Sequence, residues 1–443
     1  MKRIIIITGL LWFILVPAVF SQQKTWTLEE CVKHAIDNNI QIKQQFLQTE
    51  YQKNTLDLSK LKLLPTINGQ AGHNFSFSRT LDNSGPIPKY VQNSMYDQFS
   101  IGGNTNLFSG LQNYNTIKKN NFSLLASEQD LENIKDNVAL NVALGYLQIL
   151  LNKELVSATD QQLQISNQQI EKTRKLVEAG SSAKGNLLQI ESQAAQEEVQ
   201  LINLKNQLDI SYLTLTQLLE LQTPAGFEVE APRISVDSNS LITGNIDEIF
   251  ALAQKNRPEI KSSEFKLSAS EYDLKIAKGG RIPSINISHG FSTAYYNTSA
   301  ASFSNQMSDH KSYYVGFNLN VPILNGWQIN KGVSNARIEI QNSQYALEGT
   351  KKQLYKNIQQ AYADATAALK KYNASMKAVT SSQESFRYAE QKFNVGLVTP
   401  VDYNTAKTQL LKAQSDLAQA KYEFIFKTKV LDFYKGIPIS LPK

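Results

Sequence analysis

The sequence has a single cysteine, four histidines and a small net charge, and each shortage excludes a class of function. One cysteine in 443 residues cannot form an internal disulfide framework. No two histidines lie four residues apart, and CxxC and HExxH spacings do not occur, so we predict neither a metal site nor another cofactor. A nucleophile elbow and a phosphate loop are also missing, which argues against an enzyme. A net charge of +6 is too small for a nucleic-acid-binding chain of this length.

Long apolar runs are equally scarce, and the only one lies within residues 1–21. Lys2 and Arg3 precede an apolar run over residues 4–16, and a proline and a small-residue cleavage site follow. This layout predicts a cleaved signal peptide over residues 1–21, because the run is too short to cross a bilayer as a helix. We predict no transmembrane helix in the mature chain, whose net charge is +4 once Lys2 and Arg3 are removed. Cys31 lies ten residues beyond the predicted cleavage site, so no lipid anchor is predicted.

Two long stretches lack the residues that interrupt helices. Residues 111–178 contain no proline and one glycine, and residues 329–395 contain no proline. At about 1.5 Å per residue, each stretch could form a helix of roughly 100 Å. A glycine turn ends each stretch, at Gly180 and Gly396, and a second helix follows. These second helices have the three-four apolar spacing of coiled coils: Leu201, Leu204, Leu208, Leu215 and Leu218 in one, and Leu417, Ala420, Phe424 and Leu431 in the other.

Before each long helix, apolar and polar residues alternate with the period of a β-strand. Ile67, Phe75 and Phe77 alternate with small or polar residues such as Asn68 and Asn74. The later segments repeat this alternation, so we predict two hairpins. Their strands cover residues 67–77, 99–107, 285–295 and 313–321, with polar loops over residues 81–95 and 297–311.

One apolar face and one polar face have two interpretations. The strands could form half of a soluble sandwich, or a transmembrane barrel with its apolar face toward lipid. The barrel is favoured because tyrosines gather near the predicted loops, as in an interfacial girdle: Tyr90, Tyr96, Tyr295, Tyr296, Tyr313 and Tyr314. Four strands cannot close a barrel, and a lipid-facing sheet cannot leave its edges open. A barrel therefore requires other chains to supply the remaining strands.

Similar blocks recur in the same order in both halves of the chain. Four pairs correspond: Leu28-Glu29-Glu30 with Ile246-Asp247-Glu248, Leu64-Pro65 with Ile282-Pro283, Ser109-Gly110 with Asn325-Gly326, and Ala179-Gly180 with Val395-Gly396. We infer a duplicated unit that opens with one helix ending before a proline. Two strands, a long helix, a turn and a helix follow. The predicted divisions are a signal peptide at 1–21, repeats at 22–222 and 245–436, a connector at 223–244 and a tail at 437–443.

Distinctive motifs lie at the segment boundaries. They are Trp26-Thr27-Leu28-Glu29-Glu30, the Leu64-Pro65 and Ile282-Pro283 steps, residues 321–327 (VPILNGW), and residues 392–396 with 401–403 (KFNVG and VDY). Their order and spacing resemble TolC-type outer-membrane efflux proteins, the outer membrane factor family, over essentially the whole mature chain. The resemblance implies a mixed fold: a homotrimer whose twelve strands, four per chain, form one transmembrane β-barrel that a long periplasmic α-helical barrel continues. It also implies contact with outer-membrane lipid, a periplasmic adaptor protein and an inner-membrane transporter.

The resemblance also assigns roles at the two turns. Gly180 and Ser181, with Gly396 and Leu397, would contact the adaptor at the periplasmic tip. Asp402 lies where relatives often place a tunnel-facing acid, and three copies would form a cation-binding ring. Asp402 could equally cap the next helix. Four other predicted aperture positions depart from relatives, with neutral residues at sites that are often acidic or polar, so a tip closed by packing and hydrogen bonds is expected: Thr405, Asn186, Phe393 and Val398.

Two functions remain open from the sequence. The first is a passive exit duct for efflux or type I secretion, placed in the outer membrane and extending into the periplasm. The second is a periplasmic or surface coiled-coil interaction protein with soluble hairpins and no channel activity. A trimer that stays in the outer-membrane fraction favours the duct, and a soluble monomer favours the interaction protein.

Overall fold

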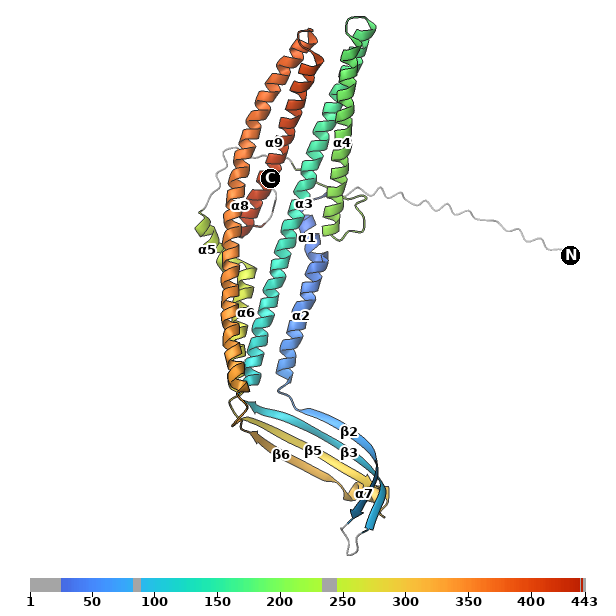
Figure 1. Ribbon diagram of the computed structural model, residues 1–443, viewed down its shortest axis with the longest axis vertical. Coiled ribbons are helices and arrows are strands. Elements are labelled where there is room, and N and C mark those ends of the chain that lie inside the picture. The colour runs from blue at the N-terminus through green and yellow to red at the C-terminus, as the bar shows by residue number, and fades with distance from the viewer. Residues whose placement is uncertain (1–24, 83–88, 233–244, 439, 441–443) are drawn as a thin grey trace, which may run out of the picture.

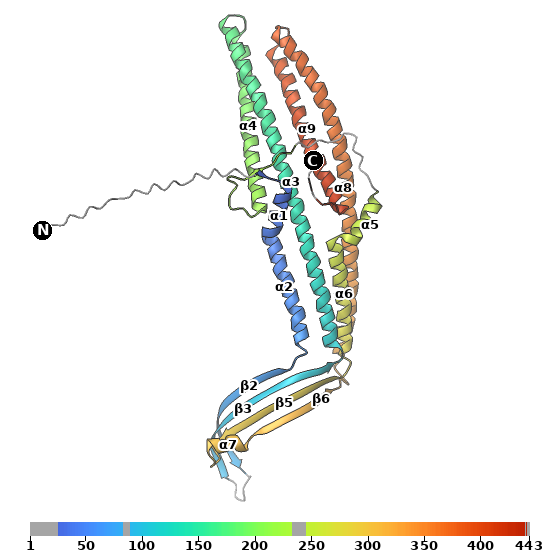
Figure 2. The ribbon, with the colours of Figure 1, turned by 180° about the vertical axis from the view of Figure 1, so that it is seen from behind.

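The computed structural model describes residues 25–82, 89–232, 245–438 and 440. The molecule is elongated, with a body of long helices and a curved four-stranded sheet at one end (Figure 1). The reverse view shows the same two parts (Figure 2). The predicted signal peptide lies outside the described residues, as do most of the connector and part of the tail.

Eight helices of the described chain build the body. The first half contributes α1 (Leu28–Asn38), α2 (Ile40–Leu61), α3 (Gln112–Glu178) and α4 (Lys184–Leu218), and the second contributes α5 (Ile246–Asn256), α6 (Pro258–Gly279), α8 (Gln328–Asn394) and α9 (Pro400–Tyr434). The two long helices lie within one residue of the predicted stretches. The apolar seam is confirmed where it was predicted, since Leu201, Leu215, Ala420 and Leu431 are buried. In the described chain, no helix is both apolar and long enough to span a bilayer.

The prediction of one opening helix per half was wrong, because each half opens with two. Asn39 breaks the first pair at φ −60° and ψ 131°, and its side chain accepts hydrogen bonds from the amides of Gln41 and Ile42. Arg257 takes an almost identical conformation in the second half, at φ −67° and ψ 130°. Pro258 follows at the first helical position, where its missing N–H costs nothing. The sequence signals were an asparagine and a proline inside apparently continuous helices.

The sheet contains β2 (Thr66–Asp82), β3 (Lys89–Ser109), β5 (Ser284–Tyr296) and β6 (Ser312–Asn320), in the antiparallel order β2-β3-β5-β6. The four predicted strands are all present, but the first hairpin is longer than expected. Asp82 pairs with Lys89, so most of the predicted loop at 81–95 is strand. The second predicted loop contains a short helix, α7 (Phe303–Asp309). Ser302 caps α7, and the side chain of Gln306, within α7, hydrogen-bonds to the backbone of Tyr296 at the end of β5.

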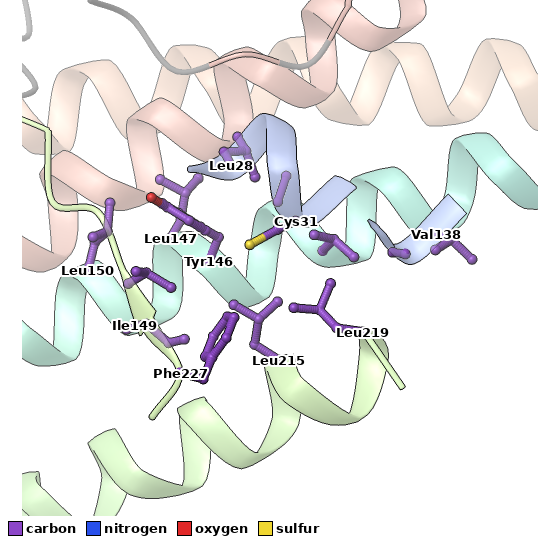
Figure 3. Packing of buried hydrophobic residues seen from close by; sticks show 14 of the residues in the cluster. Leu28, Cys31, Val138, Tyr146, Leu147, Ile149, Leu150, Leu215, Leu219 and Phe227 are labelled. Carbon is purple, nitrogen blue, oxygen red and sulfur yellow. The ribbon is translucent and has the colours of Figure 1, made fainter. Parts of the chain in front are cut away.

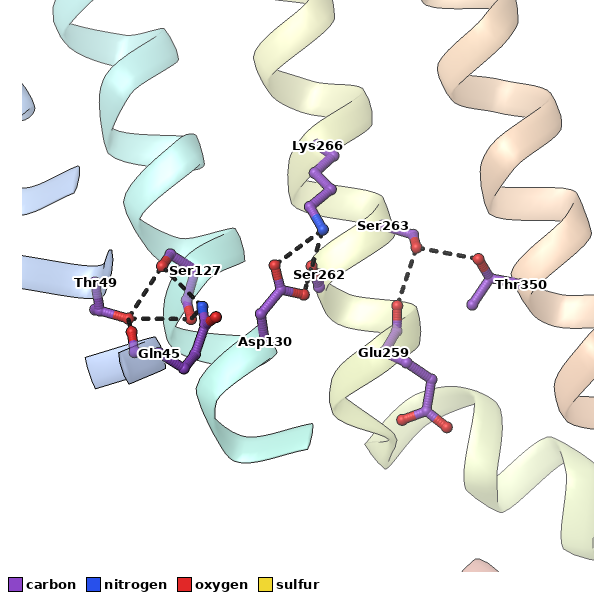
Figure 4. Close-up of polar contacts among 9 residues, drawn as sticks. All are labelled: Gln45, Thr49, Ser127, Asp130, Glu259, Ser262, Ser263, Lys266 and Thr350. Carbon is purple, nitrogen blue, oxygen red and sulfur yellow. Dashed lines mark hydrogen bonds and ion pairs between the residues drawn. The ribbon is translucent and has the colours of Figure 1, made fainter. Parts of the chain in front are cut away.

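The helices form a single layer, and different helices make up its two ends. Near the sheet the order is α2, α3, α6, α8, and farther away it is α4, α3, α9, α8 (Figure 1). A belt of polar contacts crosses the first set (Figure 4). Thr49 bonds to Ser127 at 3.0 Å, Asp130 accepts from Ser262 at 2.6 Å, and Ser263 bonds to Thr350 at 3.3 Å. Because each bond joins different helices, the belt fixes how the four helices are staggered.

The largest apolar cluster lies where the layer changes membership (Figure 3). Cys31 of α1, Tyr146 of α3 and Leu215 of α4 are fully or almost fully buried there. The short strand β1 (Thr25–Trp26) pairs in parallel with β4 (Glu228–Val229) beside this cluster. Tyr146 donates to the carbonyl of Trp26 at 3.1 Å or of Glu230 at 2.6 Å, which anchors both segments to α3. Burial raises the pKa of the Cys31 thiol to about 12, so the thiol stays protonated and inert.

Both strand-to-helix junctions use two successive left-handed residues. Gly110 and Leu111 have φ of 60° and 64°, and Gly326 and Trp327 have φ of 57° and 61°. A Cβ on Gly110 would lie 2.4 Å from the Gly279 carbonyl oxygen, so glycine is required there for space as well as for φ. Leu111 and Trp327 accept an unfavourable backbone conformation, which turns the chain sharply from the sheet into α3 and α8.

Candidate functional site

The two faces of the sheet differ in composition across all four strands, as the alternation predicts. Ile101 of β3 pairs with Phe291 of β5 and Gly69 of β2, so these residues share a face. The same register places Val315, Phe317 and Leu319 of β6 on that face. The opposite face carries small and polar residues: Asn68, Gln70, Ser100, Asn104, Asn286, Ser288 and Asn318. One sheet thus presents an apolar and a polar surface.

The apolar face is exposed rather than packed into a core. Phe77, Phe317 and Tyr313 are 83%, 73% and 76% exposed. Burying such a face from water stabilises a protein by about 25 cal/mol for every Å² of apolar surface, so leaving it uncovered in water is unfavourable. The side chains of His73 and Asp97 are hydrogen-bonded to each other on the same face, across β2 and β3. In a soluble sandwich a second sheet of the protein would cover this face, whereas in a transmembrane barrel no part of the protein covers it and it contacts lipid.

The described sheet has two outer strands, β2 and β6, each paired on one side only. An unpaired strand edge leaves a row of N–H and C=O groups without partners, which lipid cannot supply. The structure therefore has the two features from which the sequence predicted that other chains supply further strands: an apolar face and two open edges.

At the opposite end of the molecule, each helical hairpin turns at a glycine. Gly180 and Gly396 have φ of 72° and 76°, and an added Cβ would meet nothing within 4 Å at either position. In both turns the glycine and the next residue donate back to the preceding helix: Gly180 to Val177 and Ser181 to Leu176, and Gly396 to Phe393 and Leu397 to Lys392. This is the Schellman arrangement, so glycine is required for its φ alone.

The two turns differ at the start of the next helix. Thr399 and Asp402 form a complete capping box at the start of α9. The Asp402 amide donates to the Thr399 hydroxyl at 3.2 Å, and the Thr399 amide donates to the Asp402 carboxylate at 3.3 Å. The corresponding N-cap of α4 is Ala183, which has no side-chain cap. Asn186 donates to Ser182 at 3.3 Å instead. The capping interpretation of Asp402 is thus confirmed, and the predicted ring of three carboxylates stays a prediction.

A cavity of about 860 Å³ lies between the two turns. Most predicted tip residues line it, and one bond crosses it, from Lys172 to the Asn394 side chain at 2.8 Å. The predicted residues in its lining are Ser181, Asn186, Phe393, Gly396, Leu397, Val398 and Asp402. Thr405 is not among them, and its hydroxyl donates to the Val401 carbonyl of its own helix at 2.8 Å.

Tyr403 supports the turn from beneath, a contact that the sequence did not indicate. Its ring stacks on Phe393 with centroids 4.7 Å apart and packs against Phe386 at 5.5 Å. Tyr403 is 3% exposed, and burial raises the pKa of its hydroxyl to about 12, with a further contribution from the charges of Glu390 and Glu197. The aromatic stack fixes the position of Phe393 at the end of α8.

A buried polar cluster joins the two hairpins below the turns. The Lys407 Nζ of α9 lies 3.1 Å from Glu197 Oε1 of α4, and both residues hydrogen-bond to Ser166 of α3. Lys407 and Glu197 are 2% and 5% exposed. Burial lowers the pKa of Lys407, although the charge of Glu197 opposes that shift. The sequence did not indicate this cluster, because its members come from three helices. In the described chain, no group of acidic, histidine or cysteine side chains could hold a metal.

Known proteins match this chain over most of its length. The profile of the outer membrane efflux protein family matches residues 31–220 and 250–426. The outer membrane protein TolC of Escherichia coli K12 is 23% identical over 66% of this chain, and the outer membrane efflux protein BepC of Brucella suis is 19% identical over 91% of it and 84% of BepC. The match spans only 59% of the length of the E. coli protein.

Solved outer-membrane channels have the same fold. The CmeC outer membrane channel of Campylobacter jejuni superposes with a TM-score of 0.81 at 17% identity, over 92% of this chain and 85% of CmeC. VceC of Vibrio cholerae gives a TM-score of 0.75 at 16% identity, over 92% and 96% of the two chains. The sequence profile, the sheet with its apolar face and the long helices agree, and the chain belongs to the outer membrane efflux protein family.

Proposed function

We propose that the chain is one subunit of an outer-membrane exit duct, a passive conduit for efflux or type I secretion. The observation that carries the proposal is the four-stranded sheet with an exposed apolar face and two open edges. Lipid would cover the apolar face, and the polar face would line a water-filled lumen. The 13 residues of β5 and 9 of β6 suit the roughly 9–11 residues of a tilted transmembrane strand.

Side chains at the end of the sheet that joins the helices also fit a membrane boundary. Trp327, Ile323 and Leu324 are 69%, 93% and 88% exposed at the junction between β6 and α8. Tryptophan favours the interface between lipid and water, whereas these apolar side chains would be unfavourable in bulk water. We place the inner surface of the outer membrane at this junction and the helical body in the periplasm.

The missing neighbours are copies of the same chain. An apolar stripe on α2 follows coiled-coil spacing but is exposed: Ile40, Leu47, Tyr51, Leu58 and Leu61. On the opposite flank of the layer, α8 exposes Ile338 and Tyr345, which lie seven residues apart. Packing α8 of one copy against α2 of the next would bury both surfaces while β6 pairs with β2. A trimer closes this arrangement, with four strands and four helical positions from each chain.

The tip cavity is the proposed site of the aperture and of the adaptor protein. Leu397 and Val395 are 74% and 69% exposed beside the cavity, which gives an adaptor apolar surface to bury. A periplasmic adaptor and an inner-membrane transporter are the expected partners, and the transporter would supply the energy for export. The Phe393–Tyr403 stack and the Lys172–Asn394 bond support a tip closed by packing and hydrogen bonds.

The duplicated organisation remains part of this proposal. α3 and α8 have 67 residues each, α4 and α9 have 35, α2 and α6 have 22, and α1 and α5 have 11. Equal lengths in the same order support one ancestral unit copied in tandem, divided as residues 22–222 and 245–436. Two copies would give each chain the four strands that a shared barrel needs from it.

The test uses the full chain expressed in a Gram-negative host. A duct should fractionate with the outer membrane and conduct ions when the purified protein is placed in a planar bilayer. Asp402→Ala should weaken the block of that current by multivalent cations, because the carboxylate ring is removed. Glu178→Ala, an acid beside the other turn, is the control and should leave the block unchanged. Recovery as a soluble periplasmic monomer would refute the duct, and unchanged block in Asp402→Ala would refute the ring alone.

A further inference from the structure

The side chain of Tyr314 lies flat on the polar face of the sheet. In the strand register, Tyr314 of β6 pairs with Gly290 of β5, which pairs with Gly102 of β3. A Cβ placed on Gly290 would lie 2.8 Å from the Tyr314 Cε1 and hydroxyl oxygen and 2.9 Å from Cζ. A Cβ on Gly102 would lie 3.2 Å from the same hydroxyl. The ring therefore covers β5, and its hydroxyl reaches β3.

The contact depends on the glycine at position 290, and the glycine at position 102 leaves the Tyr314 hydroxyl little spare room. At a separation under 3.0 Å one of the two groups must shift, and the group against Gly290 is the Tyr314 ring, so a side chain at Gly290 would displace the ring from its place on the sheet. A glycine in a strand ordinarily weakens the sheet, because it packs no side chain against its neighbours. An aromatic ring laid over the glycine from the next strand restores that packing. Gly102, Gly290 and Tyr314 thus act as one unit across three strands.

The contact lies at only one edge of the sheet. β6, with 9 residues, is the shortest of the four strands in this sheet, and within the described sheet it pairs only with β5. On β2, the opposite outer strand, an added Cβ at Gly69 would meet nothing within 4 Å, and one at Gly72 would meet only the Asn74 amide at 3.5 Å. The ring therefore adds a side-chain contact that holds β6, the strand of this sheet with the fewest backbone hydrogen-bonding partners.

We propose that Tyr314 is a positioning residue for assembly. By packing over Gly290 and Gly102, the ring holds β6 on the curved sheet. The free edge of β6 is then positioned to pair with β2 of a second copy of this chain. The inference rests on the proposed duct, because the second copy is the neighbouring subunit of that barrel. A short strand anchored only by β5 would fray, and a frayed edge cannot template the strand of the next chain.

The test measures the temperature at which the full-length oligomer, purified from outer membranes, dissociates in semi-native electrophoresis. Tyr314→Ala and Gly290→Ala should each lower that temperature, and Tyr314→Phe should stay close to the natural protein because the ring remains. The combined Gly290→Ala/Tyr314→Ala variant should dissociate no earlier than Tyr314→Ala alone. Once the ring is absent, the added methyl group displaces nothing, so the two effects must be non-additive.

Two matched controls separate this contact from general damage to the sheet. Tyr313→Ala removes the neighbouring tyrosine, which is on the apolar face and 76% exposed, and Gly69→Ala adds a methyl group where nothing is in contact. Both should cause smaller changes than Tyr314→Ala and Gly290→Ala. If Gly290→Ala does not assemble, Gly102→Ala takes its place, with a smaller expected loss because its 3.2 Å contact is with the end of the side chain.

Three outcomes would overturn the inference. They are additive effects in the double variant, a loss in Tyr314→Phe as large as in Tyr314→Ala, or a loss in Tyr313→Ala equal to that in Tyr314→Ala. A natural protein that is monomeric would instead refute the proposed duct. The failure of the Tyr314 inference and the failure of the duct are thus distinguishable in one experiment.

Discussion

The two helical hairpins have helices of equal length, but the corresponding helices differ in how many of their residues are buried. Fifteen residues of α3 are buried and only six of α8, although both helices have 67 residues. Of the 35-residue helices, α9 buries thirteen residues and α4 seven. The difference follows from position, because α3 and α9 lie inside the layer and α4 and α8 lie at its flanks. Corresponding helices of the two halves therefore experience different surroundings.

That contrast indicates which helices present apolar surface without a covering neighbour in the same chain. Ile202 and Ile210 of α4 are 60% and 53% exposed, and Tyr345 of α8 is 71% exposed. Such apolar side chains on flanking helices predict neighbours that are outside the chain. In the interior helix α9, by contrast, Lys407 and Leu431 already have partners in the same chain. Substitutions in interior helices should affect the single chain, and substitutions in flanking helices should affect assembly.

The largest effect is expected inside the layer, at Lys407. Lys407→Met leaves the buried Glu197 without its cation, which should cost about 3–5 kcal/mol of unfolding free energy. Lys407→Met/Glu197→Leu should recover most of that loss, because no charge remains buried. Denaturant unfolding followed by circular dichroism measures both, and the exposed Lys412→Met on the same helix is the control. A double variant as unstable as the single one would contradict this assignment.

The next effect is expected at a flank. Leu47 of α2 is 66% exposed in the single chain, so Leu47→Ala should cost little in a monomer. If a neighbouring α8 buries Leu47, the trimer should lose about 2 kcal/mol per chain. The dissociation temperature of the trimer should fall while the helical signal of the dissociated chain is unchanged. Gln48→Ala, also exposed on α2, serves as the comparison, and an equal fall in both variants would rule out this interface.

A smaller effect distinguishes the two turns. Thr399→Ala removes the capping box of α9 and should destabilise that end of the hairpin by about 1 kcal/mol. Ala183→Ser supplies a cap that α4 lacks and should protect the first turn by a similar or smaller amount. Hydrogen exchange at the amides of each turn measures the two changes separately. Equal protection of both turns in the natural protein would mean that the capping difference has no effect.

The smallest effect is pH-dependent and lies where the first hairpin meets the β1–β4 pair. Burial raises the pKa of Glu228, but hydrogen bonds from Lys153 and Tyr212 outweigh it and lower the pKa overall. A lowered pKa in the folded state contributes stability above the unfolded pKa, and that stability is lost as the pH falls through the folded value. Glu228→Gln should therefore be less stable at neutral pH, with a shallower loss in acid. The effect is modest because the Glu228 side chain is 37% exposed, and Glu198→Gln, at an exposed position of α4, should change nothing.

Sequence patterns predicted the periodic parts of this fold well. The absence of proline placed α3 and α8 within a residue of their ends, and strict alternation located all four strands. Glycines 180 and 396 marked the turns because a Schellman ending needs a positive φ. Local chemistry decides all of these features, so a single sequence is sufficient to predict them.

The features that the sequence did not reveal depend on tertiary contacts. Lys407, Glu197 and Ser166 are far apart in the chain and meet only once three helices pack. The Tyr314 contact likewise depends on the register of β3, β5 and β6. The breaks at Asn39 and Arg257 did have local signals, an asparagine cap and a following proline, but helical periodicity on both sides concealed them.

We propose that each chain forms one part of a closed wall, which further copies of the same chain complete. Native mass spectrometry of the full-length protein, extracted from outer membranes in detergent, is the decisive test of this conclusion. We expect a complex with the mass of three mature chains that resists dissociation until heated. A stable species with the mass of one chain, whose exposed sheet edges and apolar stripes are tolerated without a neighbour, would contradict it.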